Sequence, residues 1–209
     1  SEIPSLTSAR NLGISKLSKK SEIVIFLDDD ITLQRDYFEK IIEVFNKYSN
    51  SKGVAGYFLP KGKCKYNSVE YLLRRLFFLE NLEENRARVL SAYGATYPYK
   101  LNKIISVEWL TGFNMAYKKE IVERFKFDEN LIKYSLAEDF DFSYRVNKKY
   151  FGSLYLTPSA KLVHRASVVE RYPTEKAAYM NQINHFYLNF KNFNFRQSLI
   201  LKMLFSRCW

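Results

Sequence analysis

The sequence predicts an α/β fold, a mostly parallel mixed sheet flanked by helices, and three observations lead to this prediction. The apolar, β-branched run at 23–27 has the length and composition of a strand buried on both faces of a parallel sheet. Apolar side chains then recur at three- and four-residue spacing over 35–48, as in an amphipathic helix. A second buried strand is expected over 53–59, ended by Pro60. This alternation of strand and helix is typical of α/β domains.

The composition is that of one sizeable globular domain. The chain has 209 residues, of which 47% are hydrophobic and 26% charged. Its formal charge of +11 implies an anionic partner: a nucleotide diphosphate, a nucleic acid or an acidic membrane surface. Cys64 and Cys208 are too few for a disulfide framework or a zinc site, which favours a reducing compartment. We find no pattern of a signal peptide or of a full transmembrane span.

The remaining elements follow from the same periodicities. Thr7 or Ser8 can cap a first helix that runs through Lys19. Further along, the pattern predicts helices over 68–84, 119–125 and 136–150, strands over 104–110, 113–117, 153–156 and 161–164, and a final helix from about Thr174.

Three consecutive carboxylates, Asp28, Asp29 and Asp30, follow the first predicted strand directly. They emerge at the carboxyl end of that strand, which is where open α/β sheets bind their ligands. Adjacent acids repel one another, and a divalent cation relieves that repulsion. Hard oxygen ligands suit Mg²⁺ or Mn²⁺, so this loop is a candidate metal site. The alternative is an acidic, solvated turn.

Two further groups have side chains that can take part in chemistry. Glu138 and Asp139 lie near the start of a predicted helix, where a carboxylate serves equally well as a general base or as a partner of the helix dipole. His164 ends a short apolar strand; it is either a packed or surface residue or a third metal ligand beside the acidic loop.

The segment at 109–114 is the remaining unusual feature. Gly112 lies between two strand-like runs and permits a bulge or the close approach of a ligand to the backbone. Trp109 offers an apolar platform of the kind on which sugars stack, and a core tryptophan is the equally good alternative.

The order and spacing of five segments resemble the family-2 glycosyltransferases with the GT-A fold. The segments are SARNLGI at 8–14, IVIFLDDDI at 23–31, WLTGFNMAYKKE at 109–120, LAEDFDFSYRV at 136–146 and LTPSAKLVHRAS at 156–167. The resemblance implies transfer of a sugar from a nucleotide-diphosphate donor to a hydroxyl acceptor, with inversion at the anomeric carbon and with Mn²⁺ or Mg²⁺ as cofactor.

The resemblance also implies a role for each candidate residue. Asp139 would be the catalytic base, and Asp30 and His164 would bind the metal. The donor would be bound by Arg10, Asn11, Asp28 and Asp29, and the donor and acceptor sugars would be lined by Trp109, Gly112 and Glu138. A single displacement needs one base and no covalent nucleophile, which agrees with the lack of a Ser/His/Asp or Cys/His pattern.

The family further implies a UDP-sugar donor, a saccharide or lipid-linked acceptor, and no nucleic-acid partner. Residues 195–209 combine apolar and basic side chains, as in a helix lying on an anionic membrane surface; an ordinary core or oligomer helix is the alternative. We therefore expect a GT-A domain over 1–170, a helical extension over 171–209, and a cytoplasmic protein peripheral to the inner face of the cell membrane.

One departure from the family pattern concerns the start of the chain. Family members place a nucleotide-binding βαβ region before the acidic strand, whereas only 22 residues precede Ile23 here. The resemblance therefore predicts an N-terminally truncated fold and a chain that binds nucleotide poorly by itself.

Two other classes of function remain open from the residues. Asp28 and Asp30 after an apolar strand resemble the nucleophile loop of haloacid-dehalogenase-type phosphatases, in which Asp28 would be phosphorylated. A non-enzymatic anion- or nucleic-acid-binding module would use the 33 Lys and Arg residues and the many tyrosines, but the basic residues are dispersed rather than gathered in one stripe.

Overall fold

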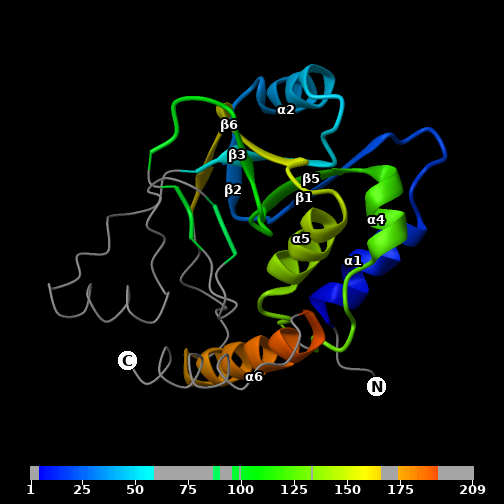
Figure 1. Ribbon diagram of the computed structural model, residues 1–209, viewed down its shortest axis with the longest axis vertical. Helices are drawn as coiled ribbons and strands as arrows, with labels where there is room; N and C mark the ends of the chain where they lie inside the picture. Colours follow the sequence, from blue (N-terminus) through cyan, green and yellow to red (C-terminus); the bar gives the residue numbers. More distant parts are fainter. Residues whose placement is uncertain are drawn as a thin grey trace, which may run out of the picture.

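The computed structural model describes residues 5–58, 87–89, 96–98, 100–132, 134–165 and 174–192. The described chain forms a mixed sheet with helices on both faces (Figure 1). Its strands are β1 (Ile23–Leu27), β2 (Ile31–Leu33), β3 (Gly53–Tyr57), β4 (Ile105–Val107), β5 (Asn114–Lys118) and β6 (Leu154–His164). Its helices are α1 (Leu6–Ser15), α2 (Tyr37–Lys47), α4 (Lys119–Phe125), α5 (Glu138–Lys149) and α6 (Thr174–Asn192). The predicted mixed α/β class is confirmed.

The strands run in the order β1-β5-β3-β6-β2, with β4 pairing β6 beside this path. Among the described strand pairs, β3 with β6 is parallel, and the pairs β1–β5, β3–β5, β4–β6 and β2–β6 are antiparallel. The sheet is therefore mixed, but its pairing is more antiparallel than the sequence led us to expect. The difference arises because β5 inserts between β1 and β3, which would otherwise be parallel neighbours.

The first strand, β1, has the predicted bounds but not the predicted environment. It pairs only with β5 among the described strands, and its residues are half-buried except for the exposed Leu27. The expectation of a strand buried on both faces of a parallel sheet is therefore corrected. Its apolar residues alternate between the two cores, with Ile23 and Ile25 on the side of α2 and Val24 and Phe26 on the opposite side. A short β-branched run is compatible with an edge strand as well as a central one, so composition alone did not distinguish them.

The last strand, β6, unites two segments that the sequence predicted as separate strands, 153–156 and 161–164. Its first half pairs with β3 and β4, and its second half pairs with β2. The register with β3 shifts between Gly56, which faces Thr157, and Tyr57, which faces Lys161. Pro158 lies within this shift, so the proline marks an irregularity in one long strand rather than its end.

One face of the sheet is covered by α2 (Figure 1). The helix buries Tyr37, Ile41 and Phe45 at four-residue spacing, and these side chains pack against Val54 of β3 and Tyr155 of β6. Exposed side chains occupy the opposite side of the helix, which gives the amphipathic pattern that the sequence predicted.

The other face of the sheet is covered by α1, α4 and α5 (Figure 1). The core there includes Ile14 from α1, Ile121 from α4 and Phe142 from α5, packed on Met115 and Tyr117 of β5. Along β5, Met115 and Tyr117 face this core while Ala116, between them, faces α2, as the period of two requires. The predicted helix over 119–125 is confirmed by α4 with the same bounds.

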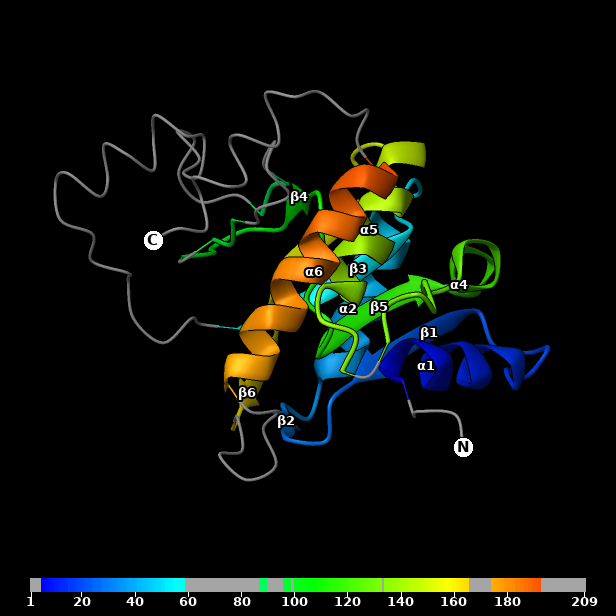
Figure 2. The same cartoon turned by 90° about the horizontal axis from the view of Figure 1, so that it is seen from below.

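The final described helix, α6, packs along α5 (Figure 2). Buried Leu188 contacts Phe140 of α5 and Leu131 of the preceding loop. None of the helices in the described residues is long and apolar enough to cross a membrane. The predicted helix over 68–84 and the basic stretch over 195–209 lie outside the described residues, and the expected division at 170/171 stays a prediction.

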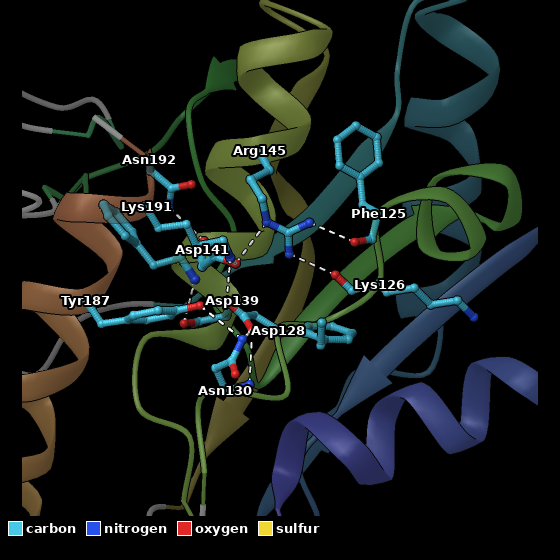
Figure 3. A network of polar contacts seen from close by, with 12 residues as sticks. Phe125, Lys126, Asp128, Asn130, Asp139, Asp141, Arg145, Tyr187, Lys191 and Asn192 are labelled. Atoms are coloured by element: carbon cyan, nitrogen blue, oxygen red, sulfur yellow. Dashed lines mark hydrogen bonds and ion pairs between the residues drawn. The ribbon is translucent and has the colours of Figure 1, made fainter. Parts of the chain in front are cut away.

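A network of polar contacts connects α6 to α5 and to the loop that precedes α5 (Figure 3). Asp141 of α5 is fully buried, and it accepts hydrogen bonds from Arg145 at 2.9 Å, Lys191 at 3.0 Å and Asn192 at 2.7 Å. Arg145 also donates to the carbonyl of Phe125 at 2.7 Å. A buried carboxylate is tolerated only where such partners replace its lost hydration, so the network holds the two helices in one relative position.

A second carboxylate, that of Asp128, completes this network from the loop side. It accepts hydrogen bonds from Lys191 at 2.6 Å and from the Tyr187 hydroxyl at 2.8 Å. Burial alone would raise the pKa of Asp128, but the hydrogen bonds from Lys191 and Tyr187 outweigh burial and lower the pKa to about 2. Lys191 therefore joins two carboxylates from separate segments.

The first prediction concerns the contact between β3 and β6. A Cβ on Gly56 would lie 2.5 Å from the carbonyl oxygen of Ala160 and 2.7 Å from the Tyr37 ring. Because the carbonyl is backbone and cannot move away, we expect Gly56→Ala to lower the free energy of unfolding by about 2 kcal/mol in urea. Gly13→Ala is the matched control, because nothing lies within 4 Å of a Cβ there. Equal stability of the two variants would contradict the assigned register.

The second prediction concerns the acid stability of the α6 contact. The pKa of Asp128 is lower in the folded chain than its ordinary value of 3.8, so its contribution to stability is full above that value and is lost as the pH falls toward 2. Allowing for solvent screening, we expect this loss to be about 1 kcal/mol. Urea unfolding of the wild type and Asp128→Asn at pH 5 and pH 2.5 measures it. The stability difference between the two proteins should shrink at the lower pH; a constant difference would exclude this assignment.

Candidate active site

The predicted site residues meet where β1 and β6 end and α5 begins. β1 leads directly into Asp28, β6 ends at His164, and α5 opens with Glu138. The turn at 111–113 joins them, because it precedes β5, the antiparallel neighbour of β1. At the last residue of this turn, the carbonyl of Phe113 accepts a hydrogen bond from the backbone N–H of Asp28 at 3.3 Å. The site is thus built on strand ends and a helix start.

Asp28, Asp30 and His164 form a candidate metal centre. One ligand atom from each of the three side chains lies within 4.8 Å of the others. His164 Nε2 lies 3.0 Å from Asp30 Oδ1, and both side chains are 27% exposed. The register of β2 and β6 produces this contact: Ile31 is paired with His164, and the Arg165 N–H donates to the carbonyl of Asp30 at 2.9 Å.

The donor set favours manganese over magnesium. Two carboxylates and one imidazole suit Mn²⁺, whereas Mg²⁺ prefers oxygen ligands throughout. The site is also short of positive charge without an ion: burial and the nearby Asp30 raise the pKa of Asp28, and Arg10 opposes this rise only in part. A divalent cation would relieve this condition, and side chains that are partly exposed leave room for one to enter.

His164 is held by an aromatic neighbour that the sequence analysis did not single out. The ring of Phe113 stacks on the imidazole with centroids 4.7 Å apart and planes 13° apart. The stacking fixes the orientation of the ring and so directs Nε2 toward Asp30. In the sequence Phe113 is marked only by its position beside Gly112, and this position does not indicate a contact with a histidine 51 residues further along the chain.

Asp139 is held by backbone N–H groups on both of its carboxylate oxygens. Oδ2 accepts from Gly112 N–H at 2.6 Å, and Oδ1 accepts from Phe140 N–H at 2.8 Å. A Cβ on Gly112 would come within 3.1 Å of Asp139 and of Glu138 Oε1. The glycine therefore permits the close approach of the turn to the two acids, and the approach of a ligand to its backbone, which the sequence analysis considered, stays a prediction.

Glu138 is buried, with 6% of its surface exposed, and is paired with Arg10. Burial raises the pKa of both Glu138 and Asp139, and the negative charge of Asp139 adds to the rise for Glu138. Arg10 and the backbone N–H groups act in the opposite direction. The two acids thus form a pair that holds a proton to a higher pH than isolated carboxyl groups do.

The backbone just before this pair is strained. Ala137 has φ 72° and ψ 18°, the left-handed region that residues other than glycine rarely adopt. The Ala137 carbonyl still accepts from Asp141 N–H at 3.0 Å, so the helix begins normally after it. Strain of this kind costs on the order of 1 kcal/mol and persists where surrounding contacts enforce it. Here it sets the direction in which Glu138 and Asp139 leave the loop.

Three other predicted site residues occupy places that the structure defines, and their proposed roles stay predictions. Asn11 exchanges two hydrogen bonds with the backbone of Phe127, at 2.9 and 2.8 Å, and so holds the loop after α4. Trp109 packs edge-on against Phe140 and donates to the Thr96 carbonyl at 2.9 Å. Asp29 is exposed.

Comparison with solved structures identifies the fold. No family model and no curated protein matches the sequence. The structure of GalNAc-T7 with UDP, GalNAc and Mn²⁺ aligns with a TM-score of 0.61 at 14% identity, over 88% of this chain. Glucosyl-3-phosphoglycerate synthase from Mycobacterium tuberculosis, in complex with Mn²⁺, UDP-glucose and phosphoglyceric acid, aligns at 0.53 and 15% over 100% of it. A197 from STIV aligns at 0.43 and 16% over 80% of each chain.

This chain spans 34% of the length of the GalNAc-T7 chain and 56% of that of the synthase. At these identities the likeness concerns the fold. The chain therefore has a GT-A-like fold, that of a sheet flanked by helices as in these two glycosyltransferases.

The third prediction tests the metal centre without a substrate. We expect Asp30→Asn to weaken binding of Mn²⁺ by more than about tenfold, because the loss of a ligand should exceed the loss of a supporting contact. Isothermal titration of the chain with MnCl₂ measures this. Asp29→Asn is the matched control, since its side chain is exposed and is not part of the cluster. An unchanged affinity in Asp30→Asn, or an equal loss in both variants, would show that the cluster is not a metal site.

Proposed function

We propose that this chain carries the catalytic residues for metal-dependent transfer of a sugar from a nucleotide-diphosphate donor to a hydroxyl acceptor, with inversion. One observation carries the proposal. The Asp28–Asp30–His164 cluster and the Glu138–Asp139 pair belong to one site, joined by Arg10, which lies 4.0 Å from Asp28 and is paired with Glu138. A metal centre beside a separate, raised-pKa carboxylate supplies the two functions that a single displacement at a sugar needs.

On the donor side, Asp30, His164 and Asp28 would hold Mn²⁺. When bound, the ion would neutralise the charge that develops on the departing diphosphate. The protein would contribute the fixed geometry, because β2–β6 pairing sets Asp30 against His164 and Phe113 sets the plane of the imidazole. The sugar would then lie between this centre and α5.

On the acceptor side, Asp139 is the best candidate for the base. Each of its oxygens accepts one backbone hydrogen bond and keeps a second lone pair, so it can still take a proton from an incoming hydroxyl. Its raised pKa makes it a stronger base than an ordinary aspartate. Glu138 is more deeply buried and is bound by Arg10, which suits it to a supporting role.

The substrates are proposed from the resemblance and from what the similar structures contain. Both similar glycosyltransferases hold UDP or UDP-glucose together with Mn²⁺, which supports a UDP-sugar donor. The acceptor would be a saccharide or a lipid-linked hydroxyl, with the chain on the cytoplasmic side of a membrane. Weak nucleotide binding by these 209 residues alone stays a prediction.

Glycosyl transfer accounts for more of the site than phosphoryl transfer does. A phosphatase would use Asp28 as its nucleophile and would need the second acidic pair on the same metal. Here Glu138 and Asp139 are instead bound by Arg10, Gly112 and Phe140. This arrangement supports a base separate from the metal.

The fourth prediction tests Asp139. With a UDP-sugar donor, Mn²⁺ and a hydroxyl acceptor, we expect Asp139→Asn to lower kcat by about 10²- to 10⁴-fold, the usual contribution of a general base. Binding of Mn²⁺ should remain as in the wild type. Glu43→Gln is the control, because Glu43 is exposed on α2 at the other face of the sheet. NMR of the initial product reports the anomeric configuration. Retention of configuration, or full activity of Asp139→Asn, would refute the proposed mechanism.

A further inference from the structure

We propose that Arg10 is a positioning residue that holds Glu138 and the Gly112 turn together and thereby fixes the position of Asp139. The sequence resemblance implied that Arg10 binds the donor directly. The contacts of the guanidinium favour a different role, in which Arg10 acts through its protein neighbours. As far as turnover is concerned, this inference rests on the proposed function.

The guanidinium joins segments that are far apart in the sequence. Nη1 lies 2.5 Å from Glu138 Oε1, and Nη2 donates to the carbonyl of Gly112 at 3.1 Å. Nη2 also lies 4.0 Å from Asp28 Oδ1, at the outer limit of an ion pair. One side chain on α1 therefore contacts the start of α5 and the turn before β5, and reaches the loop after β1.

The burial of Arg10 indicates that it serves these contacts rather than a ligand. Its side chain is 9% exposed. The guanidinium lies 5.6 Å from the centroid of the Phe26 ring and 5.2 Å from that of Phe127, close enough for cation–π attraction to both. A cation enclosed in this way has little surface left for a diphosphate. Asp28, whose side chain is 46% exposed, is the more accessible charged group beside it.

Both contacts of Arg10 lead to Asp139. Gly112 accepts a hydrogen bond from Arg10 at its carbonyl, and its N–H, in the preceding peptide group, donates to Asp139 at 2.6 Å. Glu138 is the sequence neighbour of Asp139, and its ionised form is stabilised by Arg10 against the effect of burial. Loss of Arg10 would remove one of the hydrogen bonds that hold the turn and would leave the buried carboxylate of Glu138 without its counter-ion.

The titration of the acid pair would change for the same reason. The charged and titratable groups around it are Arg10 from α1 and Tyr117 from β5, and Asp28 from the loop after β1 lies 4.0 Å from Arg10. Of these, Arg10 is the positive one. Removing it should therefore raise the pKa of Glu138 further, because an opposite charge at this distance lowers a carboxyl pKa by about 1–3 units.

A lysine would not replace this arginine fully. The two contacts use two different nitrogens of one planar group, Nη1 for Glu138 and Nη2 for Gly112. Lysine keeps the charge but offers a single ammonium on a flexible stem. Arg10→Lys therefore keeps the positive charge but loses the simultaneous contact with Glu138 and Gly112, so it tests the effect of the geometry alone.

The first experiment does not depend on turnover. Thermal unfolding is measured for the wild type and for Arg10→Met, Arg10→Lys, Glu138→Gln and the double variant Arg10→Met/Glu138→Gln. We expect Tm to fall in Arg10→Met and to recover largely in the double variant, because the unpaired buried carboxylate is then gone. Arg35→Met, at an exposed arginine, is the control. Additive effects in the double variant would overturn the proposal.

Carboxyl ¹³C NMR titration gives a second readout on the same proteins. In Arg10→Lys, which keeps the charge, the Glu138 pKa should stay near that of the wild type. In Arg10→Met it should rise by about one unit or more. An unchanged pKa in Arg10→Met would overturn the proposal even if that variant is less stable.

The kinetic experiment separates positioning from donor binding. In Arg10→Lys we expect kcat to fall by about 10- to 100-fold, as for a slightly misplaced base. The donor KM and the affinity for Mn²⁺ alone should stay within about twofold of the wild type. A raised donor KM with unchanged kcat would instead show that Arg10 contacts the donor. If the wild type transfers no sugar, the proposed function fails while the unfolding and NMR results still decide the role of Arg10.

Discussion

The arrangement of the site depends on one constraint, the burial of Glu138 beside Asp139. Two adjacent carboxylates that lose most of their hydration repel each other, and neither can stay ionised without compensation. The structure supplies that compensation from two directions: Arg10 pairs with Glu138, and the N–H groups of Gly112 and Phe140 bind Asp139. Because these partners come from α1, from the turn before β5 and from α5 itself, the contacts of the two acids hold these three segments together.

The same helix carries a second buried charge that is compensated differently. Asp141 follows the acid pair on α5, separated from it by Phe140, and is fully buried. Its carboxylate accepts hydrogen bonds from Arg145, Lys191 and Asn192 (Figure 3). These partners include two residues of α6, so the end of that helix is fixed against α5. The acid pair faces the candidate site, whereas Asp141 faces the neighbouring helix. The first turn of α5 thus places two carboxylates at the candidate site and a third, Asp141, in the contact with α6.

The geometry of the candidate metal centre depends on strand register rather than on helix packing. Asp30 and His164 come together because β2 pairs antiparallel with the second half of β6. The sheet fixes that pairing through β3, which holds the first half of β6 in parallel register. A shift of one residue would turn His164 to the opposite face and separate it from Asp30. The two halves of the site are therefore set by independent parts of the fold, and Arg10 is the side chain that reaches both.

The sequence by itself determined the local elements and the residue types of the site. Short-range periodicity and charge predicted the strand over 23–27 and the helix over 119–125. They also predicted the acidic groups after that strand and at the start of the helix that carries Glu138. It did not determine that β1 is an edge strand among the described strands, that 154–164 is one long strand, or that Asp141 is buried. Each of these depends on which segments become neighbours.

Only the tertiary structure decided which charges meet. Arg10 and Glu138 are 128 residues apart in the sequence, and Phe113 reaches His164 only through the sheet. No local pattern encodes such contacts, because strand register and helix packing are settled by the whole core at once. The amino-acid sequence thus supplied the carboxylates, the histidine and the arginine. The fold brought them together as a candidate metal centre, a candidate base and a buried cation that contacts Glu138 and Gly112 beside that base.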